Sequence, residues 1–131
     1  MTDYNINVKD EYLYQADAVE KDGIRIASEI IEKKNITACV CCGDILAVSI
    51  MKTMQEKGYM IPKDLSIVGF DDIQLANLTT PGLTTIKQNI KQKGIEAGNI
   101  LMDYLENGST IKKNIDIDTI LIKRNSTTKR L

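Results

Sequence analysis

The chain has 131 residues, of which 43% are hydrophobic and 27% are charged, so it is long enough for one globular domain with its own core. A formal net charge of −1 argues against a nucleic-acid binder, which needs a basic face, and five Tyr, one Phe and no Trp leave few rings for stacking on bases or sugars. The absence of histidine excludes a Ser-His triad and removes the commonest metal ligand.

The first half of the chain alternates short apolar runs with amphipathic segments. Residues 11–15 (EYLYQ) predict a short strand, and residues 22–34 predict a helix with Asp22 as its cap. The apolar run at 37–42 is typical of a strand that is covered on both faces. A second helix then begins with Asp44 as its N-cap and ends at Gly58.

The second half continues the same alternation. The predicted elements are a strand at 65–70, a surface excursion at 71–82 with one helical turn near 73–77, a strand at 83–86, a helix from Gln88 or Asn89 to 106, and a strand at 116–123. This β-α-β-α-β-loop-β-α-β order predicts an α/β fold, with a mostly parallel sheet flanked by helices and right-handed crossovers.

Two adjacent carboxylates, Asp71 and Asp72, follow the apolar run that ends at Phe70. A buried parallel strand ending there delivers them to the carboxyl edge of the sheet, where ligands bind in open α/β folds. Charge-assisted hydrogen bonds make a carboxylate at that edge suitable for hydroxyl-rich ligands. A cap or a solvated loop explains the pair about equally well. We expect Asp71 to face the crevice and Asp72 to bond local backbone.

Gln88 and Asp44 are the other candidate ligand contacts. Gln88 follows a short strand at the same edge, and its amide can donate and accept hydrogen bonds, as a sugar or purine site requires. A polar residue that merely opens a helix is an equal explanation. Asp44 lies at a helix start, where free N–H groups can bind a ligand, although a capping role is favoured.

The three cysteines do not predict a metal site. In a strand Cys39 and Cys41 share one face and Cys42 takes the other, and no further Cys or His completes a tetrahedral shell. Buried thiols are the simpler interpretation, so neither a metal nor a cofactor is expected. Neighbouring cysteines fit a reducing compartment and predict a cytoplasmic protein. No stretch is long and apolar enough to predict a membrane span.

Several motifs carry a family resemblance when they are taken together. They are Gly43-Asp44 before a helix, KGYMIPKDLSIVGFDD at 57–72, TTPGLTTIKQ at 79–88 and LIKRNST at 121–127. In this order they resemble the carboxyl-terminal part of the LacI/GalR family of bacterial transcriptional repressors, whose effector-binding core is similar to a periplasmic sugar-binding protein. The resemblance runs from about Glu11 to the end of the chain.

The resemblance implies that Asp71 contacts effector hydroxyls and that Gln88 lines the cleft. The family usually has Asn-Asp where this chain has Gly43-Asp44, so one side-chain contact is missing. It also implies one lobe of a two-lobe, type I periplasmic-binding-protein-like fold. Residues 1–87 form the second lobe, 88–107 a helix crossing toward the first lobe, and 108–131 a terminal strand and tail. Nearly all of the first lobe and the helix-turn-helix are absent, as in a fragment.

The expected function is therefore effector sensing within a transcriptional regulator, with a sugar or related metabolite as the effector. The resemblance implies a homodimer through residues 46–54 and 73–83, DNA binding only through the absent domain, and no membrane partner. The face of the 88–107 helix that carries Gly94 and Gly98 would lack its usual partner, the first lobe, and is therefore expected to drive self-association.

Two other functions remain open. A periplasmic sugar-binding protein of a transport system shares the fold and is the main alternative. A carboxylate-dependent α/β hydrolase is a third, which the lack of histidine and of a nucleophile elbow disfavours. The chain is therefore expected not to be an enzyme.

Overall fold

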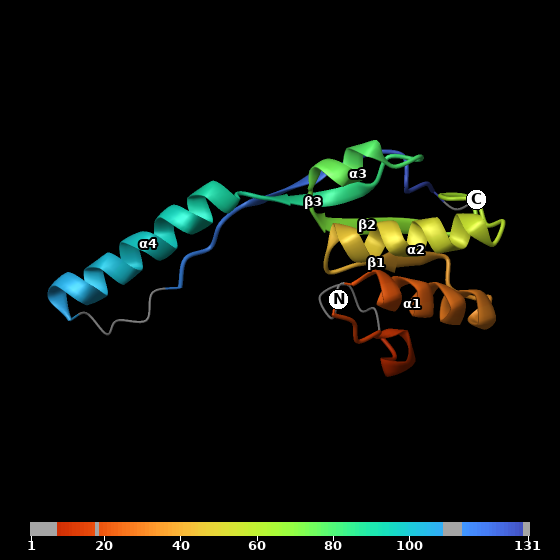
Figure 1. Cartoon of the computed structure of the whole chain (residues 1–131), viewed down its shortest axis with the longest axis horizontal. Helices are drawn as coiled ribbons and strands as arrows, with labels where there is room; N and C mark the ends of the chain where they lie inside the picture. The colour runs from red at the N-terminus through yellow and green to blue at the C-terminus, as the bar shows by residue number, and fades with distance from the viewer. Residues whose placement is uncertain (1–7, 18, 109–113, 130–131) are drawn as a thin grey trace.

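A four-stranded sheet in the order β1-β2-β3-β4 organises the molecule (Figure 1). The computed structural model describes residues 8–17, 19–108 and 114–129. The strands are β1 (Ala38–Val40), β2 (Ser66–Asp71), β3 (Thr84–Gln88) and β4 (Thr119–Ile122). β1, β2 and β3 are parallel neighbours, and β4 runs antiparallel to β3. The predicted α/β fold with a mostly parallel sheet is confirmed.

The helices alternate with the strands along the chain. They are the 3-10 helix η2 (Asp10–Tyr12) and the α-helices α1 (Glu20–Lys33), α2 (Asp44–Glu56), α3 (Gln74–Leu78) and α4 (Ile90–Asn107). The short α3 confirms the helical turn expected in the surface excursion. Gly58 follows α2 with φ 85°, a left-handed conformation that favours glycine.

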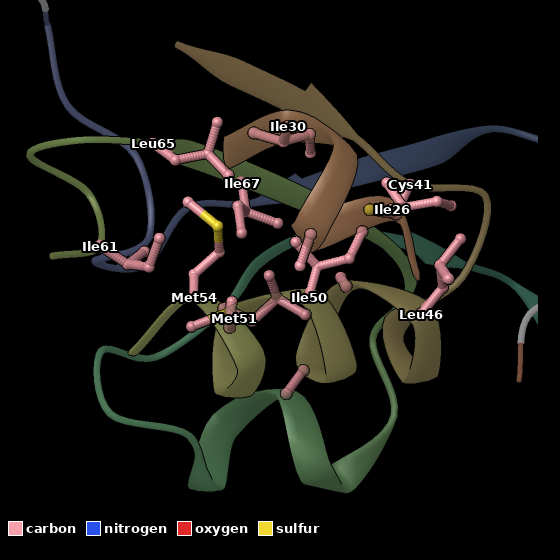
Figure 2. Close-up of a cluster of buried hydrophobic side chains, with 14 residues drawn as sticks. Ile26, Ile30, Cys41, Leu46, Ile50, Met51, Met54, Ile61, Leu65 and Ile67 are labelled. Carbon is pink, nitrogen blue, oxygen red and sulfur yellow. The ribbon is translucent and has the colours of Figure 1, made fainter. Parts of the chain in front are cut away.

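The core lies between α1, α2, α3 and the sheet (Figure 2). α1 and α2 each contribute an apolar stripe, because residues three and four apart share a face, and α3 contributes Ala76. The buried side chains are Ile26, Ala27, Ile30, Cys41, Leu46, Ala47, Ile50, Met51, Met54, Ile61, Leu65, Ile67, Ala76 and Leu83. The Met51 and Met54 stripe belongs to this core, as expected.

Close packing between α1 and α2 depends on Gly23. A Cβ at that position would lie 2.3 Å from Ser49 Oγ, so only glycine allows the helices this approach. Ser49 Oγ donates a hydrogen bond of 2.7 Å to the Glu20 carbonyl, which joins the start of α1 to α2. Gly23 therefore permits the close approach of the two helices, and the Ser49 hydrogen bond links them.

The segment that follows β4 forms hydrogen bonds to β2 and β3 near the beginnings of these strands. Ser126 is fully buried, and its Oγ accepts from the Thr84 N–H at 2.8 Å and donates to the Ile67 carbonyl at 2.6 Å. Its own carbonyl accepts from the Ile67 N–H at 2.9 Å. These three bonds satisfy backbone groups of two strands, which gives the LIKRNST motif a structural role.

Three local expectations are wrong. Residues 11–15 form no strand; the 3-10 helix η2 ends at Tyr12, and the Tyr12 and Tyr14 rings lie 5.6 and 5.0 Å from Lys33 Nζ. Asp22 does not cap α1, which begins after Val19; its carboxylate accepts instead from the Asp17 N–H at 2.9 Å. β1 is not covered on both faces, because Ala38 and Val40 are exposed, Val40 to 72%.

α4 projects away from the body of the molecule on two extended connections (Figure 1). None of its residues is buried, and a Cβ added at Gly94 or Gly98 would meet nothing within 4 Å. Its large exposed apolar side chains are Ile90, Ile95, Leu101, Met102, Tyr104 and Leu105. The face of α4 that carries Gly94 and Gly98 is exposed and is not packed against the described residues. Within the described part of the chain, every helix is too short or too polar to cross a lipid bilayer.

Candidate functional site

Asp71 and Gln88 lie together at the carboxyl edge of the sheet. Asp71 ends β2 and Gln88 ends the neighbouring parallel strand β3. Gln88 Nε2 donates a hydrogen bond of 2.6 Å to Asp71 Oδ1. Both side chains are half-buried, so each keeps some solvent-exposed surface. The fold thus joins the two residues that strand-end reasoning had selected separately.

The backbone at the end of β2 adopts an unusual conformation. Asp71 has φ 112° and Asp72 has φ 54°, values that L-residues rarely take. Such conformations cost about 1–3 kcal/mol each and cluster at active sites, ligand clamps and switch regions, although Asp adopts positive φ more readily than most residues. The two adjacent carboxylates have different partners, because Asp71 accepts from Gln88 and Asp72 accepts from Arg124.

Asp72 pairs with a cation that is distant in the sequence. Arg124 Nη2 donates to Asp72 Oδ1 at 2.7 Å, and Arg124 Nη1 donates to the Leu83 carbonyl at 2.8 Å. Lys87 Nζ lies 3.9 Å from the other Asp72 oxygen. The expected bond from the Asp72 carboxylate to local backbone is therefore wrong. Its partner lies 52 residues along the chain, where local sequence gives no signal.

Asp44 is held inside the molecule. Its side chain is 1% exposed; Thr85 Oγ1 donates to Oδ1 at 2.6 Å, and the Ile73 N–H donates to Oδ2 at 2.9 Å. The expectation that Asp44 caps α2 is wrong, because Gly43 is the N-cap and Asp44 is the first helical residue. Asp44 instead ties the start of α2 to β3 and to the loop after β2.

Gly69 makes the approach of Asp44 to the sheet possible. A Cβ at this position would lie 2.2 Å from Asp44 Oδ1. A glycine inside a strand often marks a close approach of this kind, so the sequence contained a signal for it.

A small cavity of about 230 Å³ adjoins Gln88 between the start of α4 and the segment before β4. Its lining includes Asn89, Lys93, Ile117 and Thr119. Lys93 Nζ donates to Gln88 Oε1 at 3.3 Å, so a cation, an amide and a carboxylate form a chain of hydrogen bonds from Lys93 to Asp71. Such a row offers both donors and acceptors to a hydroxyl-bearing ligand.

Sequence reasoning missed Lys93. A cation in the first turn of a helix opposes the helix dipole, so its position in α4 was a usable signal.

The interpretation of the three cysteines as buried thiols of a strand is wrong in part, because β1 ends at Val40 and only Cys41 is buried, whereas Cys39 is half-buried. Cys39 Sγ and Cys41 Sγ are 3.7 Å apart on one face, and Cys42 is exposed. The contact with Cys39, together with burial, raises the pKa of the Cys41 thiol far above its usual range, while the contact with Cys41 lowers the pKa of Cys39. Among the described residues, no group of three or more His, Cys, Asp or Glu could hold a metal ion.

Comparisons with known proteins agree with this architecture. The family profile described as periplasmic binding protein-like domain matches residues 1–127. The HTH-type transcriptional repressor PurR of Erwinia tasmaniensis is 32% identical over 127 residues, which are 96% of this chain and 37% of that protein.

Two solved structures are similar over most of the chain. The structure of transcriptional regulator LacI from Bacillus cereus subsp. cytotoxis matches with a TM-score of 0.91 at 29% identity, over 99% of this chain and 46% of that one. A LacI family regulator from Enterococcus faecium with bound ribose matches with a TM-score of 0.73 at 28% identity, over 83% of this chain and 40% of that one. The chain thus spans less than half the length of each of these relatives.

Proposed function

Because the chain belongs to the periplasmic binding protein-like domain family and its relatives are LacI-type transcriptional regulators, we propose that it forms one effector-binding lobe of such a regulator. The observation that carries the proposal is the Asp71–Gln88 pair, joined at 2.6 Å at the carboxyl edge of the sheet. That edge is where open α/β sheets bind ligands.

The proposed effector is a small hydroxyl-rich molecule such as a sugar or a related metabolite. Asp71 accepts hydrogen bonds from its hydroxyls, while Gln88 and Lys93 supply neighbouring donors. The ribose in the Enterococcus faecium relative supports this class of ligand. Gly43 offers no side chain to the ligand, so specificity depends on the remaining contacts. Asp44 supports the site by holding β3 and the loop after β2 in place.

The proposed mechanism is thermodynamic linkage between the binding of the effector and the arrangement of the two lobes. Residues 1–87 act as the body of one lobe, and 88–107 as the helix that crosses to another. An effector that prefers one arrangement shifts the population toward it and so changes DNA binding elsewhere in the regulator. This assignment makes the protein cytoplasmic and non-enzymatic, as its named relatives are repressors and regulators.

A thermal-shift screen of sugars and purines, ribose and cellobiose included, tests this function in the full-length product of the gene. We expect one chemical class to raise Tm with increasing concentration, because a ligand at 100 times its Kd adds about 2.7 kcal/mol to folding stability. No shift from any sugar or purine at millimolar concentration would reject the proposal.

We propose that α4 packs against a second polypeptide surface, which is the other lobe in a complete regulator and another copy when this chain is alone. The apolar Leu101 and Leu105 are exposed on the same side as Gly94 and Gly98, whose missing side chains leave room for close contact. Apolar patches of this kind mark interaction sites. The regulator as a whole is proposed to be a homodimer.

Sedimentation velocity of the chain is expected to show dimers or larger species at high concentration. The double variant Leu101→Glu/Leu105→Glu is expected to sediment as a monomer, whereas Asn99→Glu, a matched control on another side of α4, is expected to leave association unchanged. A monomer at every concentration would contradict the proposed role of this surface.

A periplasmic sugar-binding protein of a transport system is the second candidate. The fold is compatible with it, but the named relatives are regulators, so this function has less support.

A further inference from the structure

A second and larger cavity lies at the opposite edge of the sheet from Asp71. Its volume is about 690 Å³, within the range that holds small-molecule ligands. Ser66, which begins β2, lines this cavity, whereas Asp71 ends the same strand. Five residue steps of a strand span roughly 16 Å, so the cavity is separate from the proposed effector site. We name it the basal pocket.

One part of the basal pocket wall is apolar. Ile30 and Met54 are buried members of the core, and Ile31, Ile36 and Tyr59 are partly buried side chains packed against it. They come from the ends of α1 and α2 and from the turns that precede β1 and β2. A ligand in the pocket would therefore place an apolar surface on the wall of the domain core, where burial is favourable.

The charged side chains of the lining are mostly basic. Lys34, Lys63 and Lys129 line the pocket from three separate parts of the chain. Within residues 8–17, 19–108 and 114–129, no ion pair engages any of the three. The acidic residue in the lining, Asp64, already accepts a hydrogen bond of 2.7 Å from the Met60 N–H. Three lysines against one carboxylate give the lining side chains a formal charge of +2.

We propose that the basal pocket binds a small organic anion with an apolar body, such as an aromatic carboxylate or sulfonate. The apolar wall receives the body, and the lysine ammonium groups donate charge-assisted hydrogen bonds to the anionic group. Lys34 adopts φ 56° at the end of α1, where its backbone N–H bonds the Ile30 carbonyl, so the fold fixes where this side chain leaves the helix. This site is distinct from the proposed effector site and would give the lobe a second ligand.

Fluorescence titration with 8-anilinonaphthalene-1-sulfonate tests the proposal, with N-phenyl-1-naphthylamine as its uncharged counterpart. The double variant Lys63→Gln/Lys129→Gln is expected to weaken binding of the sulfonate about tenfold and to leave binding of the uncharged probe unchanged. The matched control Lys21→Gln/Lys91→Gln changes the same charge at exposed positions outside the pocket lining and should leave both probes unaffected.

Amide chemical shifts locate the bound sulfonate on the protein. We expect shifts at Thr37 and Ser66 in the basal pocket, with Gln88 at the other edge unchanged. Shifts confined to α4, or equal weakening by the two double variants, would overturn the proposal, since the probe would then bind the exposed apolar helix or respond only to net charge.

Discussion

Asp71→Ala is expected to weaken effector binding by about 2–4 kcal/mol, because it removes a charge-assisted acceptor from a half-buried site and leaves donors without a partner. Among the described residues, the Asp71 side chain accepts one hydrogen bond, from Gln88, so its loss should have little effect on folding. Isothermal titration calorimetry of the full-length gene product, with the strongest ligand from the screen, measures the loss.

Two further variants make this result specific. Asp71→Asn keeps the volume of the side chain but replaces one acceptor with a donor, so it should lose most of the same affinity. Asp118→Ala removes an exposed acid before β4 and should leave affinity unchanged. An Asp71→Ala protein that binds its ligand as tightly as the parent would exclude Asp71 from the binding site.

Asp44→Ala is expected to lower the free energy of unfolding by about 3 kcal/mol. The Thr85 hydroxyl and the Ile73 N–H would both lose their acceptor in a buried environment, and each unsatisfied group costs about 1–3 kcal/mol. For a chain of this length the change should reduce Tm by roughly 10 °C. Urea denaturation followed by circular dichroism measures the free-energy change.

Asp64→Ala provides the matched control for this prediction. Asp64 also accepts a hydrogen bond from a backbone N–H, that of Met60 at 2.7 Å, but it is exposed, so water can replace the lost acceptor. Its substitution should cost less than about 1 kcal/mol. Equal losses from the two variants would show that burial of Asp44 does not set its contribution.

The helices and most strands could be predicted from the sequence, because hydrophobic periodicity reports which face of an element is buried. The stripe at Ile26, Ala27 and Ile30 fixed α1 in this way. The same reasoning failed at residues 11–15, where alternating aromatic residues imitate a strand. There the rings contact Lys33, and the described structure gives the segment no neighbouring strand.

In the candidate site, too, some features could be predicted from the sequence and others could not. The position of Asp71 and Gln88 at the carboxyl edge could be predicted from sequence, since a polar residue at the end of a buried parallel strand lies there. The partners of Asp44 and Asp72 could not, because Thr85 lies 41 and Arg124 lies 52 residues away. Local pattern determines which backbone segments are strands and helices. Only tertiary packing decides which distant donor meets a buried carboxylate, since that depends on how all the elements come together.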